Sequence, residues 1–529
     1  MTSIVEEMGE MLVRSSYSPN IKERRDCSTV IFDADGNAMC QAAHIPGHFG
    51  CFLEFIPAIY KFFPRNKIRP GDVFVGNDAY EGGVTHLNDI TFASPVFIGE
   101  TLFAWVMNCG HHCDFADRGG AHIFQEGLRI PPVRFYREGA LQEDVQSLIL
   151  LNCQVPEERA ADFRAQIAAN RLGEARLRSL CEKYGVEIVR SVSNELQDYA
   201  ERRVRAGIRN IPNGVYHFGD NFERSNYPEF MDFSLTMTVH DDSLDFHFDS
   251  PPQVRAGINV VYTALLGAVY FAVRAMIDAG IPPNSGMDRA INVTAAKGTV
   301  LNCELPAAVS GRMAASQRVV ELVFGAFAEA VPERIIAGSN GAGFFSFSGV
   351  KHNKMWAYAE TVGGGSGARA TKDGLDGVHV HLTNTSNLPI EALETEYPIS
   401  VLRYELVDGS AGPGRHRGGM ALRRVYRVED TCRANVGGSR MRTQPWGFQG
   451  GRNGAAGSFS VKKDGQQSEV THNAPNPAEY HKGDVLELVT AGAGGYGPPN
   501  EREAAAIARD IREGVISAAD AKQIYNYPR

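Results

Sequence analysis

The chain has 529 residues, of which 43% are hydrophobic and 22% charged, a composition typical of an ordinary globular protein with two or three domains. Its formal net charge of −9 argues against binding to nucleic acid or to an anionic membrane, because both need a basic face. The most apolar run, residues 258–280, contains Arg274 and Asp278 and is predicted to be a buried helix. The nine cysteines form no Cys-x-x-Cys pair, which favours reduced thiols and a cytoplasmic protein over a disulfide framework.

In chain order, the first predicted element is an amphipathic helix over residues 4–15. Two strands follow within residues 28–44, joined by the turn sequence Asp-Ala-Asp-Gly. Further strands are predicted within residues 71–78 and 90–110. Residues 157–208 are rich in Ala, Arg, Glu and Leu with few helix breakers, so they are predicted to form one or two long helices.

The second half of the chain changes character. Apolar and polar residues alternate over residues 229–250 around Asp-Asp-Ser, which predicts a second hairpin. Apolar helices are predicted near residues 260–279 and 316–330. Glycine and short strands dominate residues 335–500, and a charged helical tail is predicted over residues 500–525.

These patterns together predict an α+β fold class, a multi-lobed mixed α/β protein with long helices in the middle and a strand-rich C-terminal half. Three domains are predicted. They are an N-terminal α+β metal-binding domain (1–215), a central α+β domain with a glycine-rich substrate loop (216–400), and a strand-rich C-terminal region with a helical tail (401–529).

Histidine is concentrated between His44 and His122, where six of the 15 histidines lie. His86 and Asp89 are three residues apart, and a hairpin over residues 90–108 would return the chain to the pair His111–His112. Histidine and carboxylate side chains are ligands of Zn, Mn and Fe, so this spacing predicts a divalent metal site; the alternative is a solvated polar loop. Adjacent residues of a strand point to opposite faces, so only one histidine of the pair can be a direct ligand if the segment is extended.

Other polar residues have two explanations each. Asp26, at the end of KERRD, belongs either to a solvated charge run or to the metal site. His44 and His48 either pack at the edge of the core or line a site.

Residues 359–398 combine a glycine run with Glu360, Arg369, His379 and Asn384. This block fits neither a phosphate loop nor a dinucleotide-binding pattern. A functional surface and a merely glycine-rich loop both remain open for it. The sequence GAGGYG at 492–497 is followed by two prolines instead of a helix, so it is interpreted as a turn.

Several long blocks together resemble one family. They include EEMGEMLVRSSYSPNIKERRDCSTVIFDADG, GDVFVGNDAYEGGVTHLND, GHHCD and YAETVGGGSGARATKDGLDGVHVHLTNTSNLPIEALETEYP. The chain resembles, almost from end to end, the hydantoinase B / oxoprolinase family. This family holds the B (β) subunits of ATP-dependent N-methylhydantoinases, 5-oxoprolinases and caprolactamase-type lactamases, and is related to a subunit of acetone and acetophenone carboxylases.

The resemblance implies a division of labour between two subunits. A hydantoinase A-type partner with an actin-like ATPase fold would bind ATP and activate the amide or ketone oxygen. The β subunit would carry a divalent metal, Zn, Mn or Fe, and complete the reaction. The expected assembly is an (αβ)2 or higher heteromer that acts on a small cyclic amide.

Carried over by position, the resemblance implies site residues for this chain. The metal ligands are expected to be Asp26, His86, Asp89 and His111. His112 and Asp114 are candidates for proton transfer, and the substrate candidates are His44, His48, Glu360, Arg369, His379 and Asn384. After the histidine pair this chain reads CDFADRGGAH, where the family often reads acidic-Ile-Gly-Gly, and this departure is predicted to alter substrate choice.

The predicted function is therefore the metal-bearing β subunit of an ATP-dependent cyclic-amide hydrolase acting on a hydantoin, 5-oxoproline or another lactam. One alternative is a subunit of an ATP-dependent ketone carboxylase. The other is a non-catalytic scaffold in which the metal only stabilises the fold.

Overall fold

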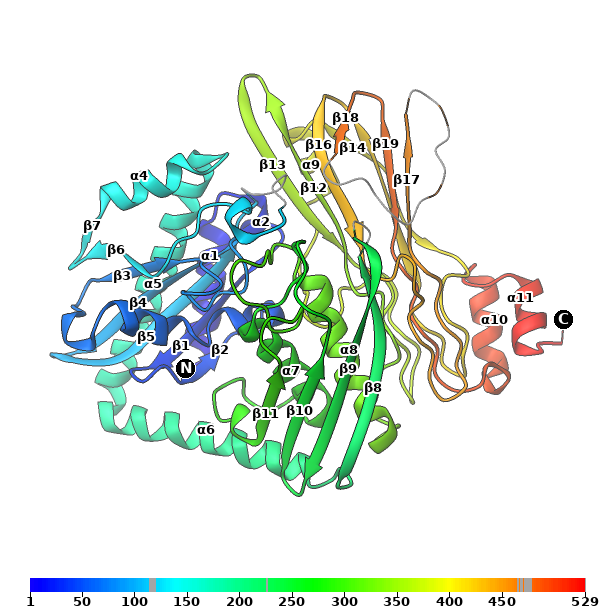
Figure 1. Ribbon diagram of the computed structural model, residues 1–529, viewed down its shortest axis with the longest axis horizontal. Helices are drawn as coiled ribbons and strands as arrows, with labels where there is room; N and C mark the ends of the chain where they lie inside the picture. The colour runs from blue at the N-terminus through cyan, green and yellow to red at the C-terminus, as the bar shows by residue number, and fades with distance from the viewer. Residues whose placement is uncertain (114–119, 225–226, 464–465, 467–469, 471–477, 529) are drawn as a thin grey trace. The chain divides into compact units, whose positions relative to one another are not determined.

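The computed structural model describes residues 1–113, 120–224, 227–463, 466, 470 and 478–528 (Figure 1). It divides into two compact units: unit 1 is Met1–Val215, Leu235–Ser316 and Asn384–Ser386, and unit 2 is Tyr216–Ser234, Gln317–Thr383 and Asn387–Arg529. The predicted boundary after residue 215 coincides with the end of the first segment of unit 1. The predicted boundary after residue 400 falls inside unit 2. The three-domain division stays a prediction, whereas the mixture of helices and several sheets confirms the α+β class.

Unit 1 is built on a seven-stranded sheet with the order β2-β1-β5-β4-β3-β6-β7. Its strands are β1 (Cys27–Asp33), β2 (Ala38–Gln41), β3 (Val73–Gly76), β4 (Asp89–Ile98), β5 (Thr101–His111), β6 (Val133–Arg137) and β7 (Ala140–Leu141). The α-helices of this unit are α1 (Thr2–Ser15), α2 (Pro19–Lys22), α3 (Phe55–Phe62), α4 (Glu143–Leu151), α5 (Pro156–Tyr184), α6 (Val186–Ile208) and α7 (Tyr262–Ile277). The predicted first helix, the hairpin β1–β2 and the two long helices α5 and α6 are confirmed.

Different helices cover the two faces of this sheet. In β1, Val30 and Phe32 pack with residues of α3 such as Phe55, whereas Ile31 packs with residues of α1 and α5. This follows from the alternation of side chains along a strand that is buried on both faces.

Helix α5 has clear start and stop signals. Pro156 occupies its first turn together with Glu157 and Glu158, whose charges suit the positive end of the helix dipole. Gly185, with φ 90°, ends it in a backbone conformation that side chains disfavour.

A row of buried polar side chains also ties α5 to the sheet. Gln166 Nε2 donates to the Ile90 carbonyl at 2.9 Å and to Asn108 Oδ1 at 2.9 Å. Four residues further along, Asn170 Nδ2 donates to the Phe92 carbonyl at 3.1 Å. Residues four apart share one helix face, so this row holds β4 and β5 in a defined position against α5.

A second sheet has the order β11-β10-β9-β8. Its strands are β8 (Gly214–Arg224), β9 (Tyr227–His240), β10 (Ser243–Asp249) and β11 (Ile291–Ala295). Strands β9 and β10 are neighbours, which confirms the predicted hairpin over residues 229–250. None of the helices in the described part of the chain is long and apolar enough to cross a membrane, and the apolar run at 258–280 contributes the buried helix α7.

Unit 2 contains two four-stranded sheets with the orders β13-β12-β16-β18 and β14-β15-β19-β17. Their strands are β12 (Gly343–Lys351), β13 (Lys354–Val362), β14 (Ile399–Val407), β15 (Ala421–Val428), β16 (Cys432–Gly438), β17 (Ser458–Lys462), β18 (Ala478–Tyr480) and β19 (Val485–Val489). The remaining helices are α8 (Met313–Ala330), α9 (Ile390–Glu396), α10 (Ala504–Arg512) and α11 (Ala518–Tyr525). One core, with Phe347, Tyr426 and Leu488 among its members, joins residues of both sheets into a sandwich.

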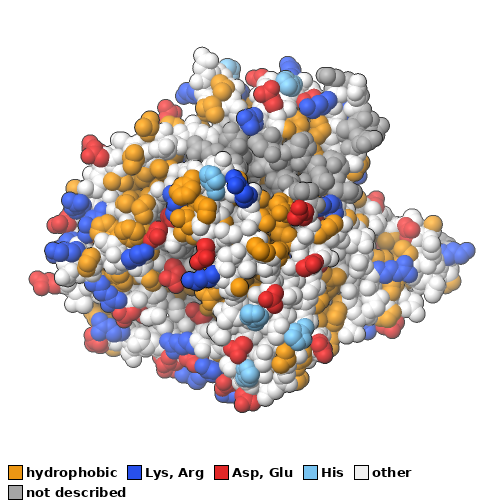
Figure 2. Space-filling model, viewed as in Figure 1, with side chains coloured by type: hydrophobic (Ala, Val, Ile, Leu, Met, Phe, Trp, Pro, Cys, Tyr) orange, Lys and Arg blue, Asp and Glu red, His pale blue; other side chains and the backbone are white. Residues whose placement is uncertain are grey.

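The glycine-rich segments of unit 2 pack backbone against backbone. A Cβ atom on Gly367 would lie 1.7 Å from the Ala337 carbonyl oxygen, and one on Gly494 would lie 1.9 Å from the Trp446 carbonyl oxygen. The amide of Ala368 donates to the Gly494 carbonyl at 3.0 Å. Glycine is required at such positions because no side chain fits between the segments. On the face shown in Figure 2, acidic and basic side chains are interspersed.

Asp288 provides a test of how one buried carboxyl affects stability. Burial raises its pKa from 3.8 to about 7, and its Oδ1 makes no hydrogen bond among the described residues. The unfolded chain therefore ionises Asp288 near pH 4 while the folded protein keeps the proton up to about pH 7. Stability contributed by the neutral form is lost as the pH rises through this window. Asp288→Asn is expected to raise the free energy of unfolding by roughly 2–4 kcal/mol at pH 8 and to change it little at pH 4.

Thermal unfolding of both proteins at several pH values between 4 and 8 measures this difference. Asp249→Asn is the matched control, since the side chain of Asp249 is 68% exposed. Parallel stability curves for Asp288→Asn and the wild type would show that the Asp288 carboxyl is not protonated in the folded protein.

Candidate metal centre

Three neighbouring strands bring polar side chains to one edge of the seven-stranded sheet. Asp89, the first residue of β4, lies directly opposite His111, the last residue of β5. The His111 amide donates to the carbonyl of Asp26, the residue before β1, at 3.0 Å. The predicted hairpin is thus confirmed, because β4 and β5 return the chain from Asp89 to His111.

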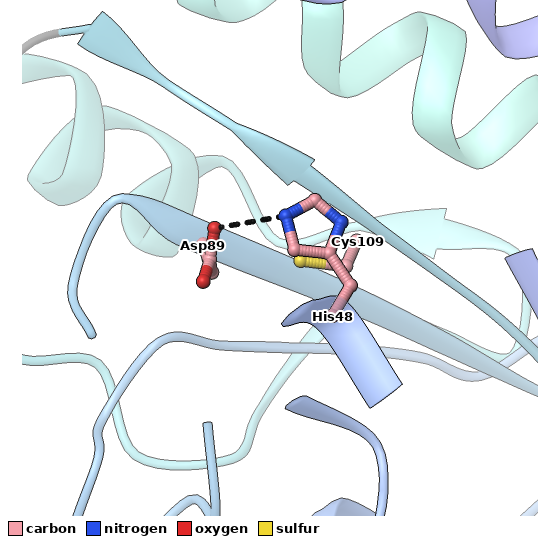
Figure 3. A group of neighbouring side chains, drawn as sticks. All are labelled: His48, Asp89 and Cys109. Carbon is pink, nitrogen blue, oxygen red and sulfur yellow. Dashed lines mark ion pairs between the residues drawn. The ribbon is translucent and has the colours of Figure 1, made fainter. Parts of the chain in front are cut away.

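Two further histidines join this edge. His86 Nε2 lies 3.1 Å from Asp89 Oδ2, and the rings of His86 and His111 are 5.1 Å apart between centroids. His48, in the short 3-10 helix η1 (Pro46–Cys51), places Nε2 3.5 Å from both Asp26 Oδ1 and Asp89 Oδ1. Figure 3 shows the His48 ring directed toward Asp89. Asp26, His48, His86, Asp89 and His111 are called the His–Asp cluster below.

The protonation states of the cluster suit metal ligands. Burial alone would raise the pKa of the Asp89 carboxyl, but His86 and Arg312 beside it hold that pKa well below its usual range. Burial, with Arg312, lowers the pKa of His86, and burial lowers the pKa of His111 to about 3. At neutral pH the carboxylate is therefore charged and both imidazoles keep a free lone pair, as metal binding requires.

Unsatisfied polar atoms provide an independent test of the fit to a metal ion. Among the described residues, both ring nitrogens of His86 and Oδ1 of Asp89 are buried without a hydrogen bond. Ligand atoms of His86, Asp89 and His111 lie within 4.8 Å of one another, as do those of His48, Asp89 and Cys109. Buried polar groups normally have partners, so these atoms fit an ion-binding role. The mixture of imidazole and carboxylate donors suits Zn, Mn or Fe.

Three residues that the sequence analysis did not single out also contact the cluster. Arg312 Nη2 lies 2.7 Å from Asp89 Oδ2, and Arg24 Nη2 lies 3.8 Å from Asp26 Oδ2. Asn20 Nδ2 lies 3.0 Å from His111 Nδ1. The charge run KERRD was a signal for Arg24, whereas Arg312 lies more than 200 residues from the other members and had none.

His112 points away from His111, as expected for adjacent residues of an extended segment. Its Nδ1 lies 3.1 Å from Arg159 Nη1, and its Nε2 lies 3.2 Å from Gln166 Oε1. Its ring is completely buried against α5. These contacts favour a role in positioning β5 over the predicted role in proton transfer. Asp114, the other predicted proton carrier, lies outside the described residues.

His44 and Asn384 belong to unit 1. The ring of His44 packs on α1, since a Cβ atom on Gly9 would lie 2.1 Å from its Cε1, and burial lowers its pKa. This favours the core-edge explanation for His44. The exposed Asn384 donates from Nδ2 to the His44 carbonyl at 3.2 Å.

The other predicted substrate residues belong to unit 2. Arg369 pairs through its backbone with Ile336 and Lys372, and burial lowers the pKa of its guanidinium. His379 Nδ1 lies 3.3 Å from Thr383 Oγ1. The predicted strand that would align His379 with His381 is wrong: both residues lie in a loop, and His381 has a positive φ of 52°.

Glu360 is part of the core of unit 2. Its carboxylate accepts from the hydroxyls of Tyr358 and Tyr426, each at 2.6 Å, and Arg424 Nε lies 3.2 Å away. The Glu360 side chain is 0% exposed, so a substrate would have to displace these partners to reach it. The geometry is that of an internal ion pair, and it does not support the predicted contact with substrate.

Glu360→Gln is therefore expected to lower the free energy of unfolding by roughly 3–5 kcal/mol, because it leaves Arg424 buried without a counter-charge. Chemical denaturation measures the loss. Glu405→Gln is the control, since Glu405 pairs with Arg423 at 43% exposure, and a change below about 1 kcal/mol is expected there. An unchanged stability with a raised KM would restore the substrate role of Glu360.

Comparisons with known proteins agree with this site and fold. The family model described as hydantoinase B/oxoprolinase matches residues 1–499. The chain is 32% identical to the putative β-type (B) chain of a D-/L-hydantoinase from Pseudomonas sp. (strain NS671), over 98% of this chain and 91% of that protein. The structure matches the crystal structure of ATP-dependent caprolactamase from Pseudomonas jessenii with a TM-score of 0.91 and 27% identity, over 99% of this chain and 94% of that one.

A nucleotide-free structure of acetone carboxylase also matches, with a TM-score of 0.88 and 17% identity, over 99% of this chain and 78% of that one. At this identity the likeness shows a shared fold only. The family match covers nearly the whole sequence and includes the segments that build the His–Asp cluster. The chain belongs to the hydantoinase B/oxoprolinase family.

Proposed function

We propose that this chain is the metal-bearing β subunit of an ATP-dependent cyclic-amide hydrolase, with a hydantoin, 5-oxoproline or another lactam as its substrate. The observation that carries the proposal is the His–Asp cluster, in which buried imidazole and carboxylate atoms converge without hydrogen-bond partners of their own. The names of its relatives, a hydantoinase and an ATP-dependent caprolactamase, support the same class of reaction.

The expected ligands are Asp26, His86, Asp89 and His111. A divalent ion held there would supply a nucleophilic hydroxide at neutral pH and polarise a carbonyl oxygen. Among this chain's own residues, Asp26 and Asp89 provide the negative charge that an ion needs. His86 and His111 contribute neutral nitrogens.

His48 occupies a place where a proton can be held during the reaction. Its Nε2 lies 3.5 Å from a carboxylate oxygen of Asp26 and the same distance from one of Asp89, while Nδ1 lies 3.1 Å from Ser28 Oγ. General acid–base catalysis requires such a group within reach of the reacting atoms. His48 is therefore our candidate for proton transfer within the cluster.

The proposal assigns ATP to a partner subunit. The sequence contains no phosphate loop, and a resonance-stabilised lactam needs its carbonyl oxygen activated before an attack can succeed. A hydantoinase A-type ATPase in an (αβ)2 or higher heteromer would supply that activation. Zn, Mn and Fe all suit the donor set, and the identity of the ion belongs to the same proposal.

Co-expression with a hydantoinase A-type ATPase tests the function. The purified complex is incubated with ATP and, in turn, with a hydantoin, 5-oxoproline and caprolactam, while ring-opened product and ADP are both quantified. Ring opening is expected only with both subunits and ATP. It is expected to fall at least about 100-fold in a complex that carries His86→Ala.

Two outcomes would contradict the proposal. Incorporation of labelled bicarbonate into a ketone product would identify a carboxylase instead. Undiminished ring opening by an assembled His86→Ala complex would identify the chain as a scaffold whose partner performs the chemistry.

A further inference from the structure

Each carboxylate of the His–Asp cluster faces a buried guanidinium of this chain. Arg312 Nη2 lies 2.7 Å from Asp89 Oδ2, and the two side chains are 5% and 0% exposed. Arg24 Nη2 lies 3.8 Å from Asp26 Oδ2, with Arg24 3% exposed. Buried arginines therefore neutralise both acids from within the chain. The pairing of Arg312 with Asp89 is the closer one.

Arg312 engages only one of the two Asp89 oxygens. Oδ2 accepts from Arg312 Nη2 and, at 3.1 Å, from the hydroxyl of Thr85, while Arg312 Nε donates to the same hydroxyl at 2.7 Å. Oδ1 makes no hydrogen bond among the described residues. Asp89 is thus held in place through Oδ2, and Oδ1 is the oxygen left for an ion.

We propose that Arg312 is a built-in counter-cation that positions Asp89 and at the same time weakens the binding of a divalent ion to the His–Asp cluster. The inference rests on the proposed metal centre and goes beyond it. The guanidinium keeps a completely buried carboxylate compensated before an ion binds, so folding does not depend on the metal. In return, two cations share one carboxylate, and the ion stays exchangeable.

The sign of the effect follows from the size of two opposing contributions. A unit charge and a divalent charge about 5 Å apart repel by on the order of 10⁴-fold in a binding constant at an effective dielectric of about 20. Loss of a residue that orients a metal ligand typically weakens metal binding by about 10–100-fold. The repulsion is the larger contribution, so removing the charge of Arg312 is expected to tighten ion binding.

The test measures dissociation constants for Mn²⁺ and Zn²⁺ by competition with a fluorescent chelator, on the full chain. Arg312→Met is expected to bind at least about tenfold more tightly than the wild type. Arg312→Lys keeps the charge and is expected to stay within about threefold of the wild type. Arg134→Met is the matched control, because Arg134 Nε lies 3.1 Å from the buried Asp72 in the same unit, and no change in affinity is expected there.

Structural damage weakens binding, so tighter binding distinguishes the proposed role from a purely structural one. If Arg312→Met does not fold, Arg312→Gln removes the charge while it keeps a donor for Asp89. Equal or weaker binding in the neutral variant that folds would overturn the inference. A wild type without measurable affinity beside a binding Arg312→Met would support it.

The outcome is separable from that of the proposed function. If the complex opens lactams but Arg312→Met binds ions no more tightly, only the inference fails. If Arg312→Met binds more tightly but no lactam is opened, only the function fails. Absence of ion binding in the wild type and all variants would overturn the inference together with the metal centre.

Discussion

Replacing His86 by alanine is expected to abolish the binding of a divalent ion. The wild type is expected to carry roughly one ion per chain, and the variant less than about a tenth of that, because the loss of one of four ligands removes a direct bond to the metal. His86 makes no hydrogen bond through either ring nitrogen among the described residues, so its removal leaves no buried donor or acceptor newly unsatisfied. Metal content measured by mass spectrometry on the purified proteins checks the prediction.

The control for this experiment is His247→Ala in the same unit. The side chain of His247 is 56% exposed, so its loss should change neither metal content nor fold. Circular dichroism shows whether each variant keeps its structure. A metal-free wild type, or a His86→Ala protein that retains its ion, would refute the assignment of His86 as a ligand.

Gly367→Ala is expected to cause the largest loss of stability. The new Cβ atom would lie 1.7 Å from the Ala337 carbonyl oxygen, and the nearest atoms around it all belong to the backbone of Ala337. A backbone atom cannot move aside as a flexible side chain can. The segments must separate, and we expect a loss of roughly 3 kcal/mol or more in the free energy of unfolding. Denaturant titration of the full chain measures it.

Gly219→Ala in the same unit is the matched control. A Cβ atom there would meet nothing closer than the Phe233 carbonyl oxygen at 3.7 Å, so a change below about 1 kcal/mol is expected. Similar stability of Gly367→Ala and Gly219→Ala would show that the glycine-rich segments of unit 2 do not pack at these distances.

Local patterns in the sequence were sufficient for most of the helices and hairpins. The apolar spacing over residues 4–15 predicted α1, and the breaker-poor stretch over 157–208 predicted α5 and α6. These elements form from contacts between residues close in the chain, and period and capping signals report such contacts directly. One detail of α1 was wrong: Met11, placed on the apolar face, is 38% exposed.

The pairing of Asp89 with His111 was also accessible from the sequence. A hairpin returns the chain to its starting point, so polar residues at both ends of two apolar strands must meet. The same reasoning predicted that only one of the adjacent histidines would face the cluster. It could not tell which, because the register of β5 against α5 decides that, through Gln166 and Arg159.

The sequence by itself therefore determined the family, the α+β class and the hairpin that holds the centre of the His–Asp cluster. Only the tertiary structure showed that Arg312 faces Asp89, that Arg424 holds Glu360 inside a core, and that glycine-rich segments distant in sequence pack on one another. The physical reason is the range of the interactions. Charge pairs and close backbone packing between residues far apart in the chain leave no periodic signal, since they depend on how complete elements come together.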